Sequence, residues 1–206
     1  MFYFISTPWL IKKANPQCIW DIPSKEKKIY LTFDDGPEPV ATSFVLSQLK
    51  AYNALATFFC IGKNVKLEPE LYERILHEGH SVGNHTYSHL NGWKTDDQQY
   101  LQDIVQAKEI IDSELFRPPY GLITRFQQKL VQGKGIALKT VMWSVLSGDF
   151  DNRISGEDCY LNVAGNAQPG SIVVFHDSKK AFSKLQYALP RVLEYFSRQG
   201  YKFEKL

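Results

Sequence analysis

Short apolar runs alternate along this chain with longer segments of helical spacing, and this alternation limits the possible folds most strongly. The runs are rich in β-branched and aromatic residues and predict buried strands at residues 29–33, 56–61, 81–83, 115–117, 140–145, 171–175 and 201–203. Apolar side chains repeat at three and four residues in segments predicted to be helical, residues 40–52, 68–78, 95–115 and 182–196. Pro190 is expected to kink the last helix or to start a new one. The alternation predicts a parallel sheet with crossover helices, as an open doubly wound sheet or a barrel.

Size and charge exclude several classes of protein. The 206 residues fit one domain. With 24 basic and 22 acidic residues the formal net charge is only +2, which gives no electrostatic case for nucleic acid or an anionic membrane as the main partner. No stretch approaches the ~18 consecutive apolar residues of a transmembrane helix. No feature of the sequence predicts an obligate protein partner.

The N-terminal sequence does not have the order of a secretory signal, because its apolar residues precede its lysines and no A-x-A cleavage pattern follows. We therefore expect a cytoplasmic chain by default. The three cysteines, Cys18, Cys60 and Cys159, are far apart and odd in number. They predict neither a zinc knuckle nor a disulfide framework, and Cys60 is expected to be a buried thiol.

Four clusters of polar side chains fall at or just after the end of a predicted strand, where active sites assemble in parallel α/β folds. The first is the adjacent pair Asp34 and Asp35, followed by Gly36 and Pro37. Neighbouring carboxylates repel, so one of them usually needs a cation or shares a proton. The same residues are also good turn formers, so a simple turn is the alternative.

The second cluster contains His85 and His89, four residues apart. Histidines at this spacing share one face of a helical turn, which lets both rings reach one metal ion. The alternative is two unrelated polar histidines. His77 and His80 are three apart at a predicted helix end, where positive charge suits the helix dipole, and we interpret them as structural.

The third cluster is Arg117, a double proline and Tyr120. The prolines stiffen the loop, which suits an arginine or an amide N–H that must be aimed, although an ordinary rigid loop has the same pattern. The fourth is His176 after a buried run, with Trp143 and Asp149 near the end of the preceding run. A lone histidine at a strand end is often just hydrogen-bonded.

Together the clusters supply a carboxylate and two histidines for a divalent cation, a second carboxylate, a third histidine and an arginine. Three protein ligands leave positions open, as in a catalytic metal site. The free acid would take a proton from water and the third histidine would protonate the leaving group, so we predict hydrolysis of an amide or ester. Two histidines and a carboxylate also describe non-haem iron oxygenases, but the α/β pattern and the paired acids argue against that class.

Five ordered motifs resemble those of the polysaccharide deacetylase (NodB-homology) family: residues 32–36, 85–89, 117–120, 143–149 and 174–176. The resemblance implies a deformed (β/α)7 barrel, TIM-like, in residues 28–206, with residues 1–27 as an N-terminal extension that packs on it. It implies metal-dependent hydrolysis of N-acetyl, possibly O-acetyl, groups from a carbohydrate such as an N-acetylglucosamine-containing oligo- or polysaccharide. Such enzymes often act in the cell envelope, which contrasts with the missing signal sequence.

The resemblance also implies residue roles. One divalent ion, zinc first and cobalt or nickel as alternatives, is expected on Asp35, His85 and His89. The groups that move or hold protons are the base Asp34, the acid His176, and their supports Arg117 and Asp149. The groups that touch the acetyl group or the sugar are the backbone N–H of Tyr120 and the side chains of Trp143, Phe150 and Val174.

Two positions depart from the family pattern. Leu146 stands where the family usually has Asp, and Phe150 where it has Trp. Phenylalanine keeps an apolar wall but has no indole donor. These departures motivate the alternative of a catalytically impaired carbohydrate-binding protein with a retained metal site.

Overall fold

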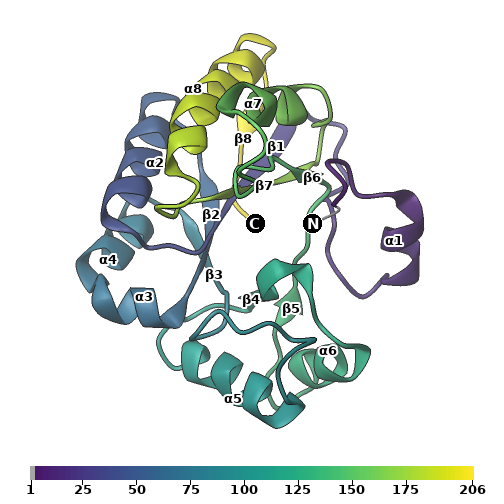
Figure 1. The fold of residues 1–206 in the computed structure, drawn as a ribbon. Coiled ribbons are helices and arrows are strands. Elements are labelled where there is room, and N and C mark those ends of the chain that lie inside the picture. Colours follow the sequence, from purple (N-terminus) through teal and green to yellow (C-terminus); the bar gives the residue numbers. More distant parts are fainter. Residues whose placement is uncertain (1–2) are drawn as a thin grey trace.

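The computed structural model describes residues 3–206 and is built around one parallel sheet ringed by helices (Figure 1). The strands run along the sheet in the order β5 (Lys139–Thr140), β4 (Leu115–Phe116), β3 (Ser81–Asn84), β2 (Ala56–Cys60), β1 (Lys28–Asp34), β7 (Ile172–His176) and β6 (Val145–Leu146). β8 (Lys202–Phe203) pairs with the start of β1. The pairs between these strands are parallel, so their C-terminal ends gather at one rim. The predicted α/β barrel of deformed TIM type is confirmed.

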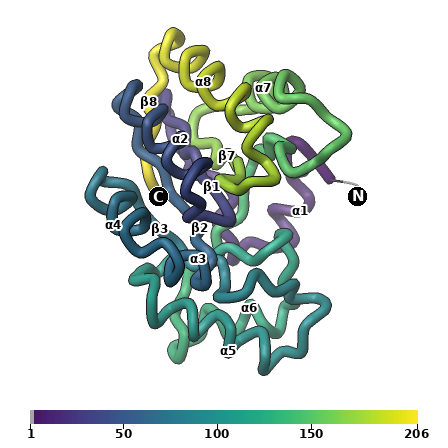
Figure 2. Tube along the Cα trace, turned by 60° about the vertical axis from the view of Figure 1, so that its left-hand side comes forward, coloured from purple at the N-terminus to yellow at the C-terminus, as the bar shows by residue number. Residues whose placement is uncertain are grey.

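The helices surround the strands in chain order. They are α1 (Trp9–Ala14), α2 (Pro39–Ala51), α3 (Gly62–Leu67), α4 (Pro69–His77), α5 (Asp97–Lys108), the 3₁₀ turn η1 (Pro119–Gly121), α6 (Arg125–Gln132), α7 (Gly156–Ala164) and α8 (Phe182–Arg198). Figure 2 shows α7 and α8 at one end of the molecule and α5 and α6 at the other. Glu38 and Asp96 cap the N-termini of α2 and α5 by accepting backbone N–H bonds.

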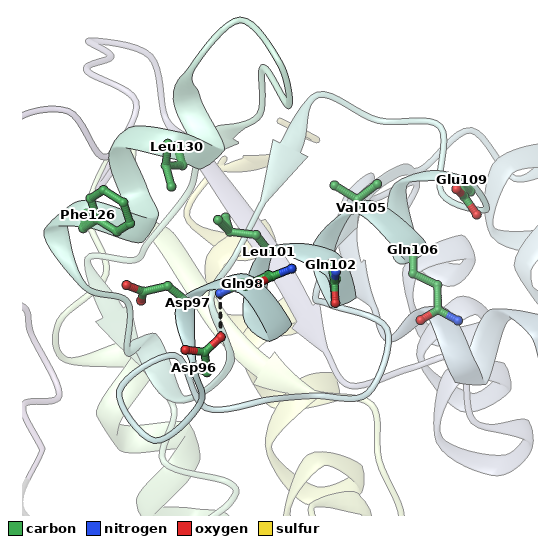
Figure 3. Close-up of a pocket in the computed structure, with 10 residues that line it drawn as sticks. All are labelled: Asp96, Asp97, Gln98, Leu101, Gln102, Val105, Gln106, Glu109, Phe126 and Leu130. Carbon is green, nitrogen blue, oxygen red and sulfur yellow. Dashed lines mark hydrogen bonds between the residues drawn. The ribbon is translucent and has the colours of Figure 1, made fainter.

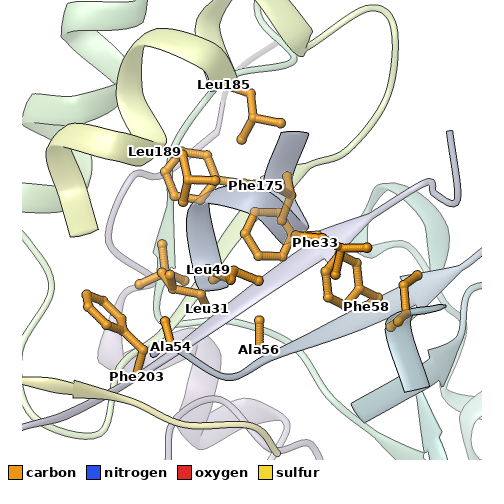
Figure 4. Packing of buried hydrophobic residues seen from close by; sticks show 14 of the residues in the cluster. Leu31, Phe33, Leu49, Ala54, Ala56, Phe58, Phe175, Leu185, Leu189 and Phe203 are labelled. Carbon is orange, nitrogen blue, oxygen red and sulfur yellow. The ribbon is translucent and has the colours of Figure 1, made fainter. Parts of the chain in front are cut away.

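Successive side chains of the central strands point alternately into the hydrophobic core and into the barrel interior. Leu31 and Phe33 of β1 face outward into the core between the sheet and helices α2 and α8 (Figure 4). The ring of Phe33 stacks on those of Phe58 and Phe175 at centroid distances of 5.2 and 6.2 Å. The intervening Asp34 points to the opposite face, because successive side chains of a strand alternate. The apolar face therefore anchors the strand that carries the first acidic cluster.

The N-terminal segment lies beside the two edge strands of the sheet, β5 and β6. Among the described residues β5 and β6 do not pair with each other, and isolated bridges link Ile19 to Val141, Ser6 to Val145 and Asp21 to Ser171. In Figure 1, α1 lies on the right, between the β5 and β6 sides of the ring. The first two residues of the predicted N-terminal extension lie outside the described residues. No helix in residues 3–206 combines the length and apolarity needed to cross a bilayer.

Several predicted elements need correction. The run 140–145 is not one strand: β5 ends at Thr140 and β6 begins at Val145, and between them the amide of Met142 donates to the carbonyl of Ile19 instead. The helix predicted at residues 95–115 ends at Lys108, and α1, α3, α6 and α7 were not predicted. α8 continues as one helix through Pro190, so the proline does not start a new helix, and buried residues lie on both sides of it.

Candidate active site

Asp34 and Arg117 form a buried ion pair at the rim of the barrel. Asp34 is the last residue of β1, 3 % exposed, and its Oδ1 accepts a 2.7 Å hydrogen bond from Nη1 of Arg117. Arg117 is fully buried and also donates to Thr32 Oγ1 and to the carbonyls of Val141 and Met142. With its donors engaged in this way, the guanidinium is fixed in one orientation, and it holds the Asp34 carboxylate in place.

Asp35, His85 and His89 bring three metal-binding atoms together. One ligand atom from each residue lies within 4.8 Å of the others. Nε2 of His89 is 3.2 Å and Nε2 of His85 is 3.7 Å from Oδ1 of Asp35. His85 Nδ1 lies 2.7 Å from the carbonyl of Arg117, so Nδ1 carries the proton and Nε2 has a lone pair directed at Asp35.

This donor set fits a divalent metal ion. Asp35 Oδ1 is buried and makes no hydrogen bond to another described residue. Burial lowers the pKa of His85 to about 4, so its ring is neutral, as a ligand requires. Although burial favours the neutral acid, the neighbouring imidazoles of His89 and His176 hold the pKa of Asp35 well below its usual range. Two imidazoles and one carboxylate make up the protein ligands of a known class of catalytic zinc site.

The two histidines converge for a different reason from the predicted one. Residues 85–89 are not helical but form a bent loop after β3, in which Thr86 and His89 have φ values of 61° and 58°. Asp103 of α5 holds this loop, because its Oδ2 accepts from the backbone N–H groups of residues 87 and 88, each at 2.9 Å. The spacing of four residues therefore predicted that His85 and His89 converge, although they do so through a different local structure.

His176 and Asp149 form a second supported pair. His176 ends β7, and its Nδ1 lies 2.7 Å from Oδ1 of Asp149, while its backbone N–H donates to Oδ2 of the same carboxylate. Asp149 is fully buried. Burial opposes charge on the imidazole, but the Asp149 carboxylate outweighs it and raises the pKa of His176 to about 10. The ring is therefore protonated at neutral pH and can donate a proton.

The remaining predicted residues lie around these pairs. Tyr120 has a φ of 60° in η1, and its exposed ring packs edge-on against His89 at 4.7 Å. Trp143 stands beside the same turn, since a Cβ on Gly121 would lie 2.6 Å from its ring. Val174 is 1 % exposed and shares the inner face of β7 with His176, two residues further along.

The two departures occupy the β6 side of the site. Leu146 is 5 % exposed, and its backbone N–H donates to the carbonyl of Ile5 at 2.8 Å. Phe150 is half-buried and packs edge-on against His176 at 5.4 Å. Leu146 is thus a buried apolar residue in register with Val174 of β7, and Phe150 contacts the His176 ring.

Sequence reasoning missed a buried residue that holds the loop of Asp35. Asp177 is fully buried, its backbone N–H donates to the Asp34 carbonyl, and its Oδ1 accepts from the Gly36 N–H, both at 3.0 Å. Its other oxygen accepts from the hydroxyl of Thr42. Asp35 between these contacts has a φ of 83°, a strained value for a side chain other than glycine. The sequence signal for this role was a carboxylate directly after a strand-end histidine.

A hollow also lies away from these residues. A groove of about 840 Å³ runs between α5 and α6, lined by Leu101, Val105, Phe126 and Leu130 with Asp96 and Asp97 at one end (Figure 3). None of the described site residues above lines this groove. His80 is also separate: it is 5 % exposed and accepts the backbone N–H of Ala56, which agrees with its structural interpretation.

Comparisons with known proteins agree with this geometry. A family model described as polysaccharide deacetylase matches residues 21–137. A peptidoglycan-N-acetylglucosamine deacetylase of Bacillus cereus is 38 % identical over 190 residues, which cover 89 % of this chain and 88 % of the relative. A peptidoglycan-N-acetylmuramic acid deacetylase of Bacillus subtilis is 34 % identical over 194 residues, covering 89 % and 71 % of the two chains.

A solved structure extends the match to the fold. A peptidoglycan N-acetylglucosamine deacetylase in complex with 4-naphthalen-1-yl-N-oxidanyl-benzamide superposes with a TM-score of 0.87 at 32 % identity, covering 97 % of this chain and 95 % of that one. The resemblance predicted from the motifs is confirmed. The chain therefore belongs to the polysaccharide deacetylase family and is a hydrolase of that class.

Proposed function

We propose that this chain hydrolyses N-acetyl groups of an N-acetylglucosamine-containing carbohydrate with one divalent ion, zinc first and cobalt or nickel as alternatives, held by Asp35, His85 and His89. The observation that carries the proposal is the convergence of their three ligand atoms within 4.8 Å. Two further ion pairs belong to the same site: Asp34 is held by Arg117, and His176 is held by Asp149. When bound, the ion supplies Lewis acidity to the acetyl carbonyl and acidity to the attacking water.

Asp34 is the general base. Its Oδ1 is occupied by Arg117, so its other oxygen accepts the proton of the attacking water. His176 is the general acid and gives its Nε2 proton to the departing sugar amine, since its Nδ1 is engaged with Asp149. Asp149 stabilises the positive ring before transfer and keeps it aimed. The two protons thus pass through two separate groups, one held by Arg117 and the other by Asp149.

The acetyl group and the sugar contact the surrounding loops. The backbone N–H of Tyr120 donates to the oxyanion, an interaction that in other acyl-transfer enzymes contributes ~3 kcal/mol. Val174 lines the pocket for the acetyl methyl group, and Trp143 and Phe150 provide apolar walls for the sugar. Residues 28–206 form the catalytic domain in this proposal, and residues 1–27 an extension that packs on it.

Peptidoglycan is the proposed source of the N-acetylglucosamine. Relatives that are 32–38 % identical over most of this chain, one of them covered to 88 %, are described as peptidoglycan deacetylases. Both N-acetylglucosamine and N-acetylmuramic acid occur in those descriptions, so the test includes both sugars.

The test is acetate release from peptidoglycan, N-acetylglucosamine oligomers and acetylated xylan, after chelation and again after zinc, cobalt or nickel is restored. Release from the first two substrates that stops with the chelator and returns with metal supports the proposal. Release from xylan alone would shift the substrate to an O-acetyl ester. Metal binding without release from any substrate would favour a carbohydrate-binding protein, the alternative that Leu146 and Phe150 motivate.

A further inference from the structure

We propose that the N-terminal segment, residues 3–7, is part of the catalytic site and that Tyr3 is a positioning residue for the acid His176. This inference rests on the proposed function, because it concerns the proton donor of that reaction. It is carried by contacts between Tyr3, the turn that bears Asp149 and Phe150, and the ring of His176.

The N-terminal segment runs beside residues 143–146 and is tied to them at three points. The Thr7 hydroxyl donates to the Trp143 carbonyl at 2.8 Å, and the Thr7 N–H donates to the Ser144 carbonyl at 2.9 Å. The Leu146 N–H donates to the carbonyl of Ile5 at 2.8 Å. This pairing fixes the direction in which the segment leaves the sheet. Tyr3, two residues before Ile5, consequently lies at the rim of the barrel.

Tyr3 holds both ends of a tight turn. The amide of Asp151 donates to the carbonyl of Gly148 at 2.9 Å, so residues 148–151 close on themselves with Asp149 and Phe150 at the centre. The Tyr3 hydroxyl donates to Asp151 Oδ2 at 2.9 Å, and a Cβ on Gly148 would lie 3.2 Å from the same hydroxyl oxygen. Tyr3 therefore spans the first and last residues of the turn.

An aromatic chain connects this clamp to the acid. The ring of Tyr3 packs edge-on against Phe150 at 5.0 Å, and Phe150 packs edge-on against His176 at 5.4 Å. On the other side of the turn, Lys184 donates to the carbonyl of Asp149 at 3.1 Å. The turn is thus held from the N-terminal segment and from α8. Its two central residues, Asp149 and Phe150, both contact the His176 ring.

Both departures from the family pattern lie next to these contacts. Phe150 lacks an indole N–H with which to anchor itself, and here an edge-on contact with Tyr3 restrains its ring. The backbone N–H of Leu146 donates to the carbonyl of Ile5, and its side chain is 5 % exposed. Residues 146 and 150 therefore both contact the N-terminal segment, the first through its backbone and the second through its ring.

The test compares Tyr3→Leu and Tyr3→Phe with the matched control Tyr201→Leu. Tyr201 is also half-buried and packs edge-on against one aromatic ring, that of Phe196 at 5.1 Å, but it precedes β8 at the opposite end of β1. We expect Tyr3→Leu to lower kcat for acetate release by about threefold to tenfold, the range of a lost aromatic contact, with KM and zinc affinity within twofold of wild type. Tyr3→Phe keeps the ring and should fall between wild type and Tyr3→Leu.

Tyr201→Leu is expected to lower the Tm and leave kcat within twofold of wild type. A kcat for Tyr3→Leu equal to that of Tyr201→Leu would overturn the inference, and so would a loss confined to KM or to zinc affinity. If Tyr3→Leu does not fold, a wild-type kcat for Tyr3→Phe overturns it. Absence of acetate release from the wild-type protein would instead refute the proposed function.

Discussion

Replacing Asp177 by alanine is expected to weaken metal binding by about 5- to 30-fold, although Asp177 is not one of the proposed ligands. Asp35 has a φ of 83°, and the left-handed region costs a non-glycine residue ~1–2 kcal/mol. Asp177 opposes this strain by accepting the Gly36 N–H on the C-terminal side of Asp35. Without that bond, the binding conformation of Asp35 is less favourable by ~1–2 kcal/mol. This free energy corresponds to the stated loss of metal affinity.

The same substitution also affects stability. It leaves the Gly36 N–H and the Thr42 hydroxyl without their buried acceptor, at ~1–3 kcal/mol each. Asp177→Asn keeps an acceptor for Gly36 and should bind metal within about twofold of wild type. Gly36→Ala tests the contact from the other side, because its Cβ would lie 2.1 Å from Asp177 Oδ2.

The assay is titration of the metal-free protein with zinc against a chromophoric chelator, alongside urea unfolding of each variant. Loss of affinity in Asp177→Ala and Gly36→Ala, with Asp177→Asn near wild type, supports the reasoning. If Asp177→Ala is less stable but binds zinc with unchanged affinity, Asp35 is held by other contacts, such as the 2.7 Å bond from Asn64 to its carbonyl, and the argument fails.

Three further predictions concern the proton-transfer groups and the metal. Asp34→Asn should lower kcat by about 10²- to 10⁴-fold while zinc still binds, and an unchanged kcat would remove Asp34 from the role of base. His89→Ala should abolish the rise in Tm that zinc gives the wild-type protein, because one ligand is lost; an undiminished rise would place the metal elsewhere. The pKa of His176 is raised to about 10, so its pairing with Asp149 stabilises the fold fully below the unfolded value of ~6.5 and loses this contribution as pH rises towards 10. Urea unfolding between pH 6 and 10 should therefore show a steeper alkaline loss of stability in wild type than in Asp149→Asn, and equal slopes would contradict the pairing.

Much of the site was predictable from the sequence, because its residues lie at strand ends. Asp34, Asp35, Arg117 and His176 follow or end apolar runs that form parallel strands, and parallel strands bring their C-terminal ends to one rim. Residue type and order along the chain therefore predicted the proposed base, the proposed ligands and the proposed acid before their distances were known. The run at residues 29–33 was predicted as a buried strand and forms most of β1, whose Leu31 and Phe33 enter the core.

Other features depended on contacts between distant segments. Residues 140–145 have strand composition, but the N-terminal segment competes for their backbone, and the run divides into β5 and β6. Asp103 and Asp177 fix the loops of His89 and Asp35 through hydrogen bonds to backbone N–H groups, and the sequence does not show which N–H groups a carboxylate accepts from.

The sequence by itself determined that the chain forms an α/β fold. It also determined which polar groups end which strands, because local periodicity and residue type are properties of short segments. Only the tertiary structure decided which backbone conformations those groups adopt and that Tyr3 stands 5.0 Å from Phe150. The left-handed conformations of Asp35, Thr86 and His89 are locally unfavourable. They persist because contacts from other strands and helices offset their cost, and those contacts exist only once the chain has folded.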